Sequence, residues 1–371
     1  MRFTCLQENL QNALSVVERI AGRNAALPIL SAVLISTHQN RLQFVATDLE
    51  LGATTWCAGK LEGEGRLALP MRLITQFVSN FIPQTKLQLD FNPPHLTVTT
   101  ENSKATFRGL DTKDFPIIPA FTPLHAVTVP VKTLLHGLGQ VLPAVATHEA
   151  RPEINGVLFA ISKNELKLAA TDTFRLAEKI ITTQAPDDNV SRAARVIVPH
   201  RTLHEVVRIF SAGTEDIHID VGEHQLCFHT PTAQLISRLI AGEYPNYAAI
   251  IPTKFQNNTV VASKAFAGLV RGAAIFATKL NDIHVGIETS KRAVRVSAVD
   301  PDKGDHTATA PAEISGEPLE ASFNYRYLLD GIEAIPTDNL EFAATSASTP
   351  AVIKPRGDPS FIYVIMPIRR S

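Results

Sequence analysis

Three stretches of the chain repeat one pattern, which reads NRLQFVATD at 40–48, NELKLAATD at 164–172 and KRAVRVSAVD at 291–300. Each begins with polar turn residues, continues with alternating polar and apolar residues, and ends in an aspartate. Such alternation predicts a strand with one buried face. The pattern recurs about every 125 residues, which is the size of a domain. The sequence therefore predicts three copies of one domain.

Two amphipathic helices accompany each copy of the pattern. The apolar residues Leu10, Leu14 and Val17 follow helical spacing, and a proline at a helix start loses no hydrogen bond. The predicted first helices are 7–21, 131–142 and 263–277, and the predicted second helices are 70–82, 199–210 and 324–335. Most of the remaining residues alternate as strands do, as in KLQLDF at 86–91.

These elements predict an α+β fold of three repeated domains, each with two helices and antiparallel sheets. The expected domains are residues 1–125, 126–253 and 254–371, with joins near Pro123–Thr128 and Pro252–Asn258. Repeated domains present equivalent faces at a fixed rotation, so a second chain added head to tail can close a ring. A closed ring leaves no free sheet edge.

The composition favours a soluble cytoplasmic protein. The chain has 371 residues, and its 35 lysines and arginines nearly balance its 36 aspartates and glutamates. Its three cysteines form no CxxC pair, which favours a reducing compartment over a disulfide framework. The N-terminus lacks the apolar core of a signal peptide, and no stretch approaches the ~20 apolar residues of a membrane span. We expect no membrane association.

Motifs of catalysis and of metal binding are missing from the sequence. There is no GxSxG, GxGxxG or GxxxxGK[ST] motif. His200 and His204 lack a third zinc ligand in sight, and Pro311 stands where a calcium loop in DPDKGD would need its glutamate. We expect no catalytic residue, no cofactor and no metal ion.

Seven short words of the sequence together resemble the bacterial DNA polymerase III beta clamp family. They are LPIL (27–30), ATDLE (46–50), DFP (114–116), INGVLF (154–159), ATDTFRLA (170–177), YPNY (244–247) and YVIMPIRR (363–370). They occur in the family's order and spacing over the whole chain. The resemblance implies a ring-shaped homodimer with helices inside and sheets outside, which encircles double-stranded DNA without reading its sequence.

The resemblance also implies what the ring does and which proteins it meets. Such a clamp is a non-catalytic subunit of the polymerase holoenzyme, and it confers processivity in DNA replication by tethering the polymerase. The implied partners are the DNA polymerase III alpha subunit, the clamp loader and other proteins with clamp-binding motifs.

A partner-peptide pocket between the second and third domains is implied for thirteen residues. They are Ile154, Thr171, Thr173, Phe174, Arg175, Leu176, Pro245, Ile250, Val364, Ile365, Met366, Pro367 and Ile368. Apolar walls and an adaptable methionine suit leucine or phenylalanine anchors of varied partners. Many relatives have Gly-His where this chain has Thr173-Phe174, so we expect a pocket of altered shape that is still apolar. Without the resemblance, core packing would explain the same residues.

The same resemblance implies DNA-binding and dimer-interface residues. The expected DNA contacts are Arg23, His148, Arg151 and Arg201, all cationic or titratable. Pro152 and Glu153 depart from the aromatic residues of some members. The expected dimer-interface residues are Phe107, Ile275 and Phe276, which are apolar as association surfaces require. Solvated helix faces and ordinary core positions are the alternative readings of these residues.

Two alternatives from other functional classes stay open at this point. One is an enzyme whose site residues are dispersed over several domains, which perturbed carboxylates or histidines in a cleft would support. The other is a ring-shaped scaffold that does not bind DNA, whose inner wall would lack net positive charge. Neither explains ATDTFRLA or the C-terminal YVIMPIRR.

Overall fold

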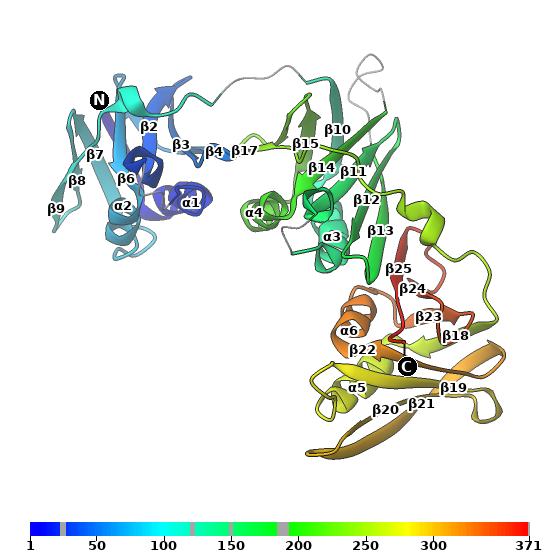
Figure 1. Cartoon of the computed structure of the whole chain (residues 1–371). Coiled ribbons are helices and arrows are strands. Elements are labelled where there is room, and N and C mark those ends of the chain that lie inside the picture. Colours follow the sequence, from blue (N-terminus) through cyan, green and yellow to red (C-terminus); the bar gives the residue numbers. More distant parts are fainter. Residues whose placement is uncertain (23–26, 119–122, 148–150, 184–192, 370–371) are drawn as a thin grey trace. The chain divides into compact units, whose positions relative to one another are not determined.

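The computed structural model describes residues 1–22, 27–118, 123–147, 151–183 and 193–369 (Figure 1). Its described residues divide into two compact units. The first contains Met1–Val131 and His204–Leu239, and the second contains Lys132–Gln184, Arg192–Leu203 and Ile240–Ser371. Each unit is described by itself below.

Apart from β5, which is described only in the first repeat, helices and strands follow one order three times along the chain. The first repeat contains β1 (Arg2–Leu6), α1 (Gln7–Glu18), β2 (Ala32–His38), β3 (Arg41–Thr47), β4 (Leu51–Cys57), β5 (Lys60–Glu62), β6 (Arg66–Pro70), α2 (Met71–Val78), β7 (Lys86–Asn92), β8 (His95–Thr99) and β9 (Lys104–Arg108). The second contains β10 (His125–Pro130), α3 (Val131–Val141), β11 (Gly156–Ile161), β12 (Glu165–Thr171), β13 (Arg175–Thr182), β14 (Ala194–Pro199), α4 (His200–Phe210), β15 (Asp216–Val221), β16 (Gln225–His229) and β17 (Ala233–Arg238).

The third repeat contains β18 (Asn257–Ala262), α5 (Ser263–Ala274), β19 (Asp282–Glu288), β20 (Ala293–Asp300), β21 (Gly304–Gly316), β22 (Leu319–Asn324), α6 (Tyr325–Glu333), β23 (Asn339–Ala344), β24 (Ala351–Pro355) and β25 (Phe361–Ile365). All the strand pairs within the described ranges are antiparallel. The predicted α+β class, with two helices in each repeat, is therefore confirmed.

The predicted helices exist, but several end earlier than the sequence suggested. Helix α2 stops at Val78, because the side chains of Ser79 and Asn80 both donate to the carbonyl oxygen of Gln76, at 2.9 Å each. Such side chains compete with the backbone for helix hydrogen bonds. In α1 the residues Leu10 and Leu14 are fully buried against β3 and β4, as their spacing predicted.

The sheets join consecutive repeats by the same kind of strand pair. In the first unit the strand order is β5-β1-β7-β8-β9 and β10-β15-β16-β17-β4-β3-β2-β6. In the second unit it is β14-β11-β12-β13-β25-β24-β23-β18-β21-β20-β19-β22. Strand β4 of the first repeat thus pairs with β17, the last strand of the second repeat. Strand β13 of the second repeat pairs with β25, the last strand of the third.

Helices α5 and α6 lie side by side in the second unit (Figure 1). They are short, as are all the helices of the described ranges, and none is long and apolar enough to cross a membrane. Helix α5 packs on β20 and β21, and α6 contacts β22 and β25. The third repeat therefore buries both helices against its own strands, while β25 extends its sheet into the second repeat.

Candidate functional site

An apolar cluster marks the joint between β13 and β25. Ile154, Leu176 and Val364 belong to it, and their exposed fractions are 4%, 1% and 3%. Leu176 lies directly across the strand pair from Val364. The structure therefore brings YVIMPIRR next to INGVLF and ATDTFRLA, which lie much earlier in the sequence. The three side chains therefore form part of a buried apolar core at this joint.

The turn before β13 displays Phe174 beside this joint. Asp172 Oδ1 accepts the N–H groups of Phe174 and Arg175, at 3.0 and 2.9 Å. Thr171 Oγ1 donates to the carbonyl oxygen of Arg175 at 2.7 Å and accepts the N–H of Thr173 at 3.1 Å. Thr173 has a φ of 77°, a left-handed conformation that a β-branched residue rarely adopts. The fixed turn leaves Phe174 59% exposed.

Arg175 links this turn to helix α6. Its guanidinium bonds Asp172 Oδ2 at 2.9 Å, bonds Asp330, and stacks over the ring of Tyr327 at 4.2 Å. Burial alone would lower the pKa of Arg175, but its interactions with Tyr363, Asp330 and Asp172 raise that pKa above its usual value. Arg175 therefore holds the wall of the site in place.

The C-terminal segment continues along the turn. The N–H of Met366 donates to the carbonyl oxygen of Phe174 at 2.9 Å, and Met366 is half-buried. Pro367 is buried, and the N–H of Ile368 donates to Ser322 at 2.7 Å. Ile365 is fully buried and points to the opposite face from Val364, because successive strand residues alternate.

The segment that precedes the third repeat contributes more buried residues than the sequence suggested. Tyr244 and Tyr247 belong to the cluster, and Tyr247 Oη donates to Glu178 Oε2 at 2.6 Å. Pro245 is half-buried, and its carbonyl oxygen accepts the N–H of Tyr247. Ile250 is 54% exposed, whereas its neighbour Ile251 packs on the cluster. The YPNY word was the only signal for both tyrosines.

The residues expected to contact DNA are only partly described. Arg151 is exposed and pairs with Glu153 at 3.0 Å. Arg201 is exposed in the first turn of α4. Arg23 and His148 lie outside the described residues.

The expected dimer-interface residues lie at two places in the fold. Phe107 is half-buried on β9, which ends the five-stranded sheet, and its ring meets Phe77 edge-on at 5.2 Å. Ile275, just after α5, is 67% exposed. Phe276 stacks on His306 of β21 with 5.8 Å between the ring centroids. In the described part of the chain, no group of three His, Cys, Asp or Glu side chains is arranged for a metal ion.

Comparisons with known proteins agree along the whole chain. Models of the N-terminal, central and C-terminal domains of the DNA polymerase III beta subunit match residues 1–119, 128–246 and 248–369. The beta sliding clamp of Synechococcus elongatus is 29% identical over 100% of this chain and 99% of its own length.

Solved structures agree with these matches. The DNA polymerase III subunit beta of Pseudomonas aeruginosa matches with a TM-score of 0.93 at 24% identity, covering all of both chains. A sliding clamp of Bartonella birtlesii bound to griselimycin matches with a TM-score of 0.91 at 26% identity, again over all of both chains.

The fold is thus that of the three-domain DNA clamps. The chain belongs to the DNA polymerase III beta subunit family. Its function is that of a beta sliding clamp, a non-catalytic subunit that confers processivity on DNA polymerase III.

Proposed function

We propose that two copies of the chain associate head to tail into a ring that encircles double-stranded DNA in the cytoplasm. The observation that carries this proposal is the joint between repeats, because the chain uses the same strand pair twice. In the described residues β9 has β8 on one side and no strand on the other, and the 304–311 part of β21 has only β20. Strand β9 is the counterpart of β17 and β25, and β21 is the counterpart of β4 and β13, but neither has the partner that its counterparts have. Strand β9 therefore pairs with β21 of a second copy.

The existing joints also set the register of this third pair. Leu51, Arg175 and Gly304 each begin their strand after the turn. Ser237 lies across from Leu51. The N–H of Thr230 donates to the carbonyl oxygen three residues later, in the turn that leads into β17, and the N–H of Thr100 does the same in the turn that leads into β9. Counting seven residues from each threonine makes Phe107 the counterpart of Ser237. Phe107 therefore lies opposite Gly304 of the partner subunit. A side-chain carbon at Gly304 would be 3.9 Å from Phe276, so the ring of Phe276 gives this position an apolar neighbour.

The ring built in this way has three domains per subunit, which we place at residues 1–125, 126–253 and 254–371. Arg23, His148, Arg151 and Arg201 contact phosphates without reading bases, as a sliding protein requires. Tethering raises the local concentration of the polymerase at the template.

Replacing Arg201 with Gln weakens the binding of duplex DNA equally for all sequences. One phosphate contact fewer lowers the slope of log affinity against log salt by about 0.9. Fluorescence anisotropy with two unrelated duplexes over a salt series measures both quantities. Lys113→Gln, at an exposed residue outside the proposed DNA contacts, leaves affinity and slope unchanged. An unchanged slope in Arg201→Gln would remove this residue from the DNA contacts.

The joint between β13 and β25 binds apolar anchors of the DNA polymerase III alpha subunit, the clamp loader and other partners with clamp-binding motifs. The buried apolar core of Ile154, Leu176 and Val364, with the exposed ring of Phe174 in the turn before β13, supports this assignment. Thr171, Thr173 and Arg175 fix the turn. Pro245, Ile250, Ile365, Met366, Pro367 and Ile368 complete the proposed site.

Truncating Phe174 to Ala weakens the binding of a labelled peptide from an alpha-subunit clamp-binding motif by about three- to tenfold. The lost aromatic contact corresponds to about 1 kcal/mol. Titration by fluorescence anisotropy gives the dissociation constants. Leu280→Ala removes another well-exposed apolar side chain, outside the proposed site, and serves as the matched control. If neither the original protein nor the control binds at high micromolar concentration, the assignment of the site is wrong.

A further inference from the structure

Each repeat has three side chains that lie next to one another on three neighbouring strands, and these triplets are equivalent in the three repeats. The strand registers define the triplets, since the first member of each lies across from the other two. The triplets are Leu34, Val45 and Ala68 in the first repeat, Leu158, Ala169 and Ile197 in the second, and His284, Ser297 and Ser322 in the third. The triplet is therefore apolar in the first and second repeats and polar in the third.

The chain that leaves each repeat crosses its triplet in the same way. A backbone N–H donates to the carbonyl oxygen of the third member of the triplet. These bonds are Leu110 to Ala68 at 2.9 Å, Ile240 to Ile197 at 3.0 Å, and Ile368 to Ser322 at 2.7 Å. The equivalence of the three triplets thus rests on backbone geometry as well as on strand register.

In the first two repeats an aromatic ring packs on the triplet. Phe115, 4% exposed, packs on Leu34 and Ala68. Tyr244, 8% exposed, belongs to the same cluster as Leu158 and Ile197. Each ring follows an acidic residue and precedes a proline, in the segments Asp-Phe-Pro at 114–116 and Glu-Tyr-Pro at 243–245. The surface of the triplet, which we call the seat, therefore packs against an extended chain segment in the first two repeats.

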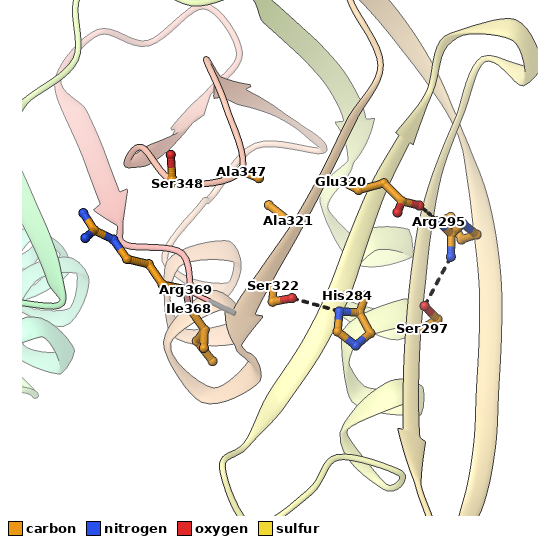
Figure 2. Close-up of a pocket in the computed structure, with 10 residues that line it drawn as sticks. All are labelled: His284, Arg295, Ser297, Glu320, Ala321, Ser322, Ala347, Ser348, Ile368 and Arg369. Carbon is orange, nitrogen blue, oxygen red and sulfur yellow. Dashed lines mark hydrogen bonds and ion pairs between the residues drawn. The ribbon is translucent and has the colours of Figure 1, made fainter. Parts of the chain in front are cut away.

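In the third repeat no described residue fills this seat with a ring, and a cavity of about 830 Å³ lies there (Figure 2). Figure 2 shows His284 and Ser322 side by side, with 2.9 Å between Nδ1 and Oγ. Ser297 and Ser322 are both 8% exposed, so their hydroxyl groups form a recessed polar wall. Ile368 and Arg369 border the cavity where the chain crosses it.

Two arginines and one glutamate are the charged residues among the described residues that line the cavity. Arg295 bonds Glu288 at 2.9 Å and Ser297 at 3.3 Å, and it pairs with Glu320. Arg369 is exposed at the other side. Arg295 is thus bonded to two carboxylates, so Arg369 is the described lining residue whose positive charge faces a ligand. That charge favours a ligand that brings a negative charge.

We propose that this cavity binds an extended acidic segment of a partner protein, with a carboxylate seated on the polar triplet where the other repeats seat an aromatic ring. The cavity shares Ile368 with the proposed peptide site, but Ile154, Leu176 and Val364 do not line it. A hydroxyl and imidazole wall hydrogen-bonds a carboxylate, whereas an apolar wall strongly disfavours one. The specificity of the seat therefore follows from the residues of the triplet.

Three synthetic peptides test the preference directly. The first has the sequence of residues 111–119, DTKDFPIIP, which supplies the ring of the first repeat. The other two carry Phe115→Glu and Phe115→Gln. We expect the full-length protein to bind the Glu peptide about tenfold more tightly than the Gln peptide, since a charge-assisted hydrogen bond adds about 1.5 kcal/mol. The Phe peptide binds most weakly.

Exchange of the triplet tests the location. The variant His284→Leu/Ser297→Ala/Ser322→Ile copies the triplet of the second repeat, so it reverses the preference in favour of the Phe peptide. The milder Ser297→Ala/Ser322→Ala variant lowers the affinity for the Glu peptide even if the triple variant folds poorly. Phe174→Ala, at the apolar site, leaves all three affinities unchanged. Equal binding of the Glu and Phe peptides, no binding at millimolar concentration, or an unchanged preference in the serine variant would overturn the proposal.

Discussion

Replacing Phe107 with Asp is expected to convert the proposed dimer into a monomer of 40.4 kDa. In the proposed joint the ring of Phe107 lies opposite Gly304 of the partner subunit, next to an exposed Ile275 and a stacked Phe276. A carboxylate placed there loses its hydration without gaining a partner, which costs several kcal/mol. We therefore expect the dissociation constant of the dimer to rise at least about 100-fold above that of the original protein.

Light scattering over a concentration series measures this change. The matched control is Ile117→Asp, which puts the same charge on a side chain that is 87% exposed and belongs to neither proposed edge. The control stays dimeric. A dimer that persists in Phe107→Asp at low micromolar concentration would show that β9 does not form the joint.

Changing Gly331 to Ala destabilises the third repeat by about 2 kcal/mol, which is typical of overpacking a core. A side-chain carbon at this position of α6 would come within 2.5 Å of the ring of Tyr363. That ring is fully buried, and its hydroxyl group donates to the carbonyl oxygen of Tyr327 at 2.8 Å, so the ring has little room to move. Helix α6 also carries Asp330, so we expect the contact with Arg175 to loosen as well.

Urea unfolding, followed by circular dichroism, gives the loss of free energy. Gly268→Ala in α5 is the control, because a side-chain carbon there meets no atom within 4 Å. An exposed helix glycine replaced by alanine stabilises by about 0.5–1 kcal/mol. Equal stabilities of the two variants would mean that the ring of Tyr363 can move aside.

The repeats and the helices were predictable because they depend on local spacing. The strand alternation in 40–48 and 164–172 gives the buried face of each strand, and the structure confirms it. The pairs of β4 with β17 and of β13 with β25 were not predictable. Alternation tells which face is buried but not which distant strand is the neighbour.

The arrangement of the candidate site was predictable only in part, and for the same reason. Leu176 and Val364 were expected from their sequence words, and they lie directly across from each other on paired strands. The contact of Arg175 with Asp330 joins residues 155 positions apart, and no pattern near either residue announces it. The polar triplet of the third repeat was also missed, because Ser297 and Ser322 differ from their counterparts in chemistry but not in alternation.

Retention on circular against linear DNA tests the ring most directly. The clamp loader places the labelled protein on a closed circular duplex, which is passed over a sizing column before and after one restriction cut. The account predicts a dimer that stays on the circle and leaves the cut molecule through its ends, because the link is topological and the contacts with phosphates are weak. Equal retention on both forms, or none on the circle, would contradict it.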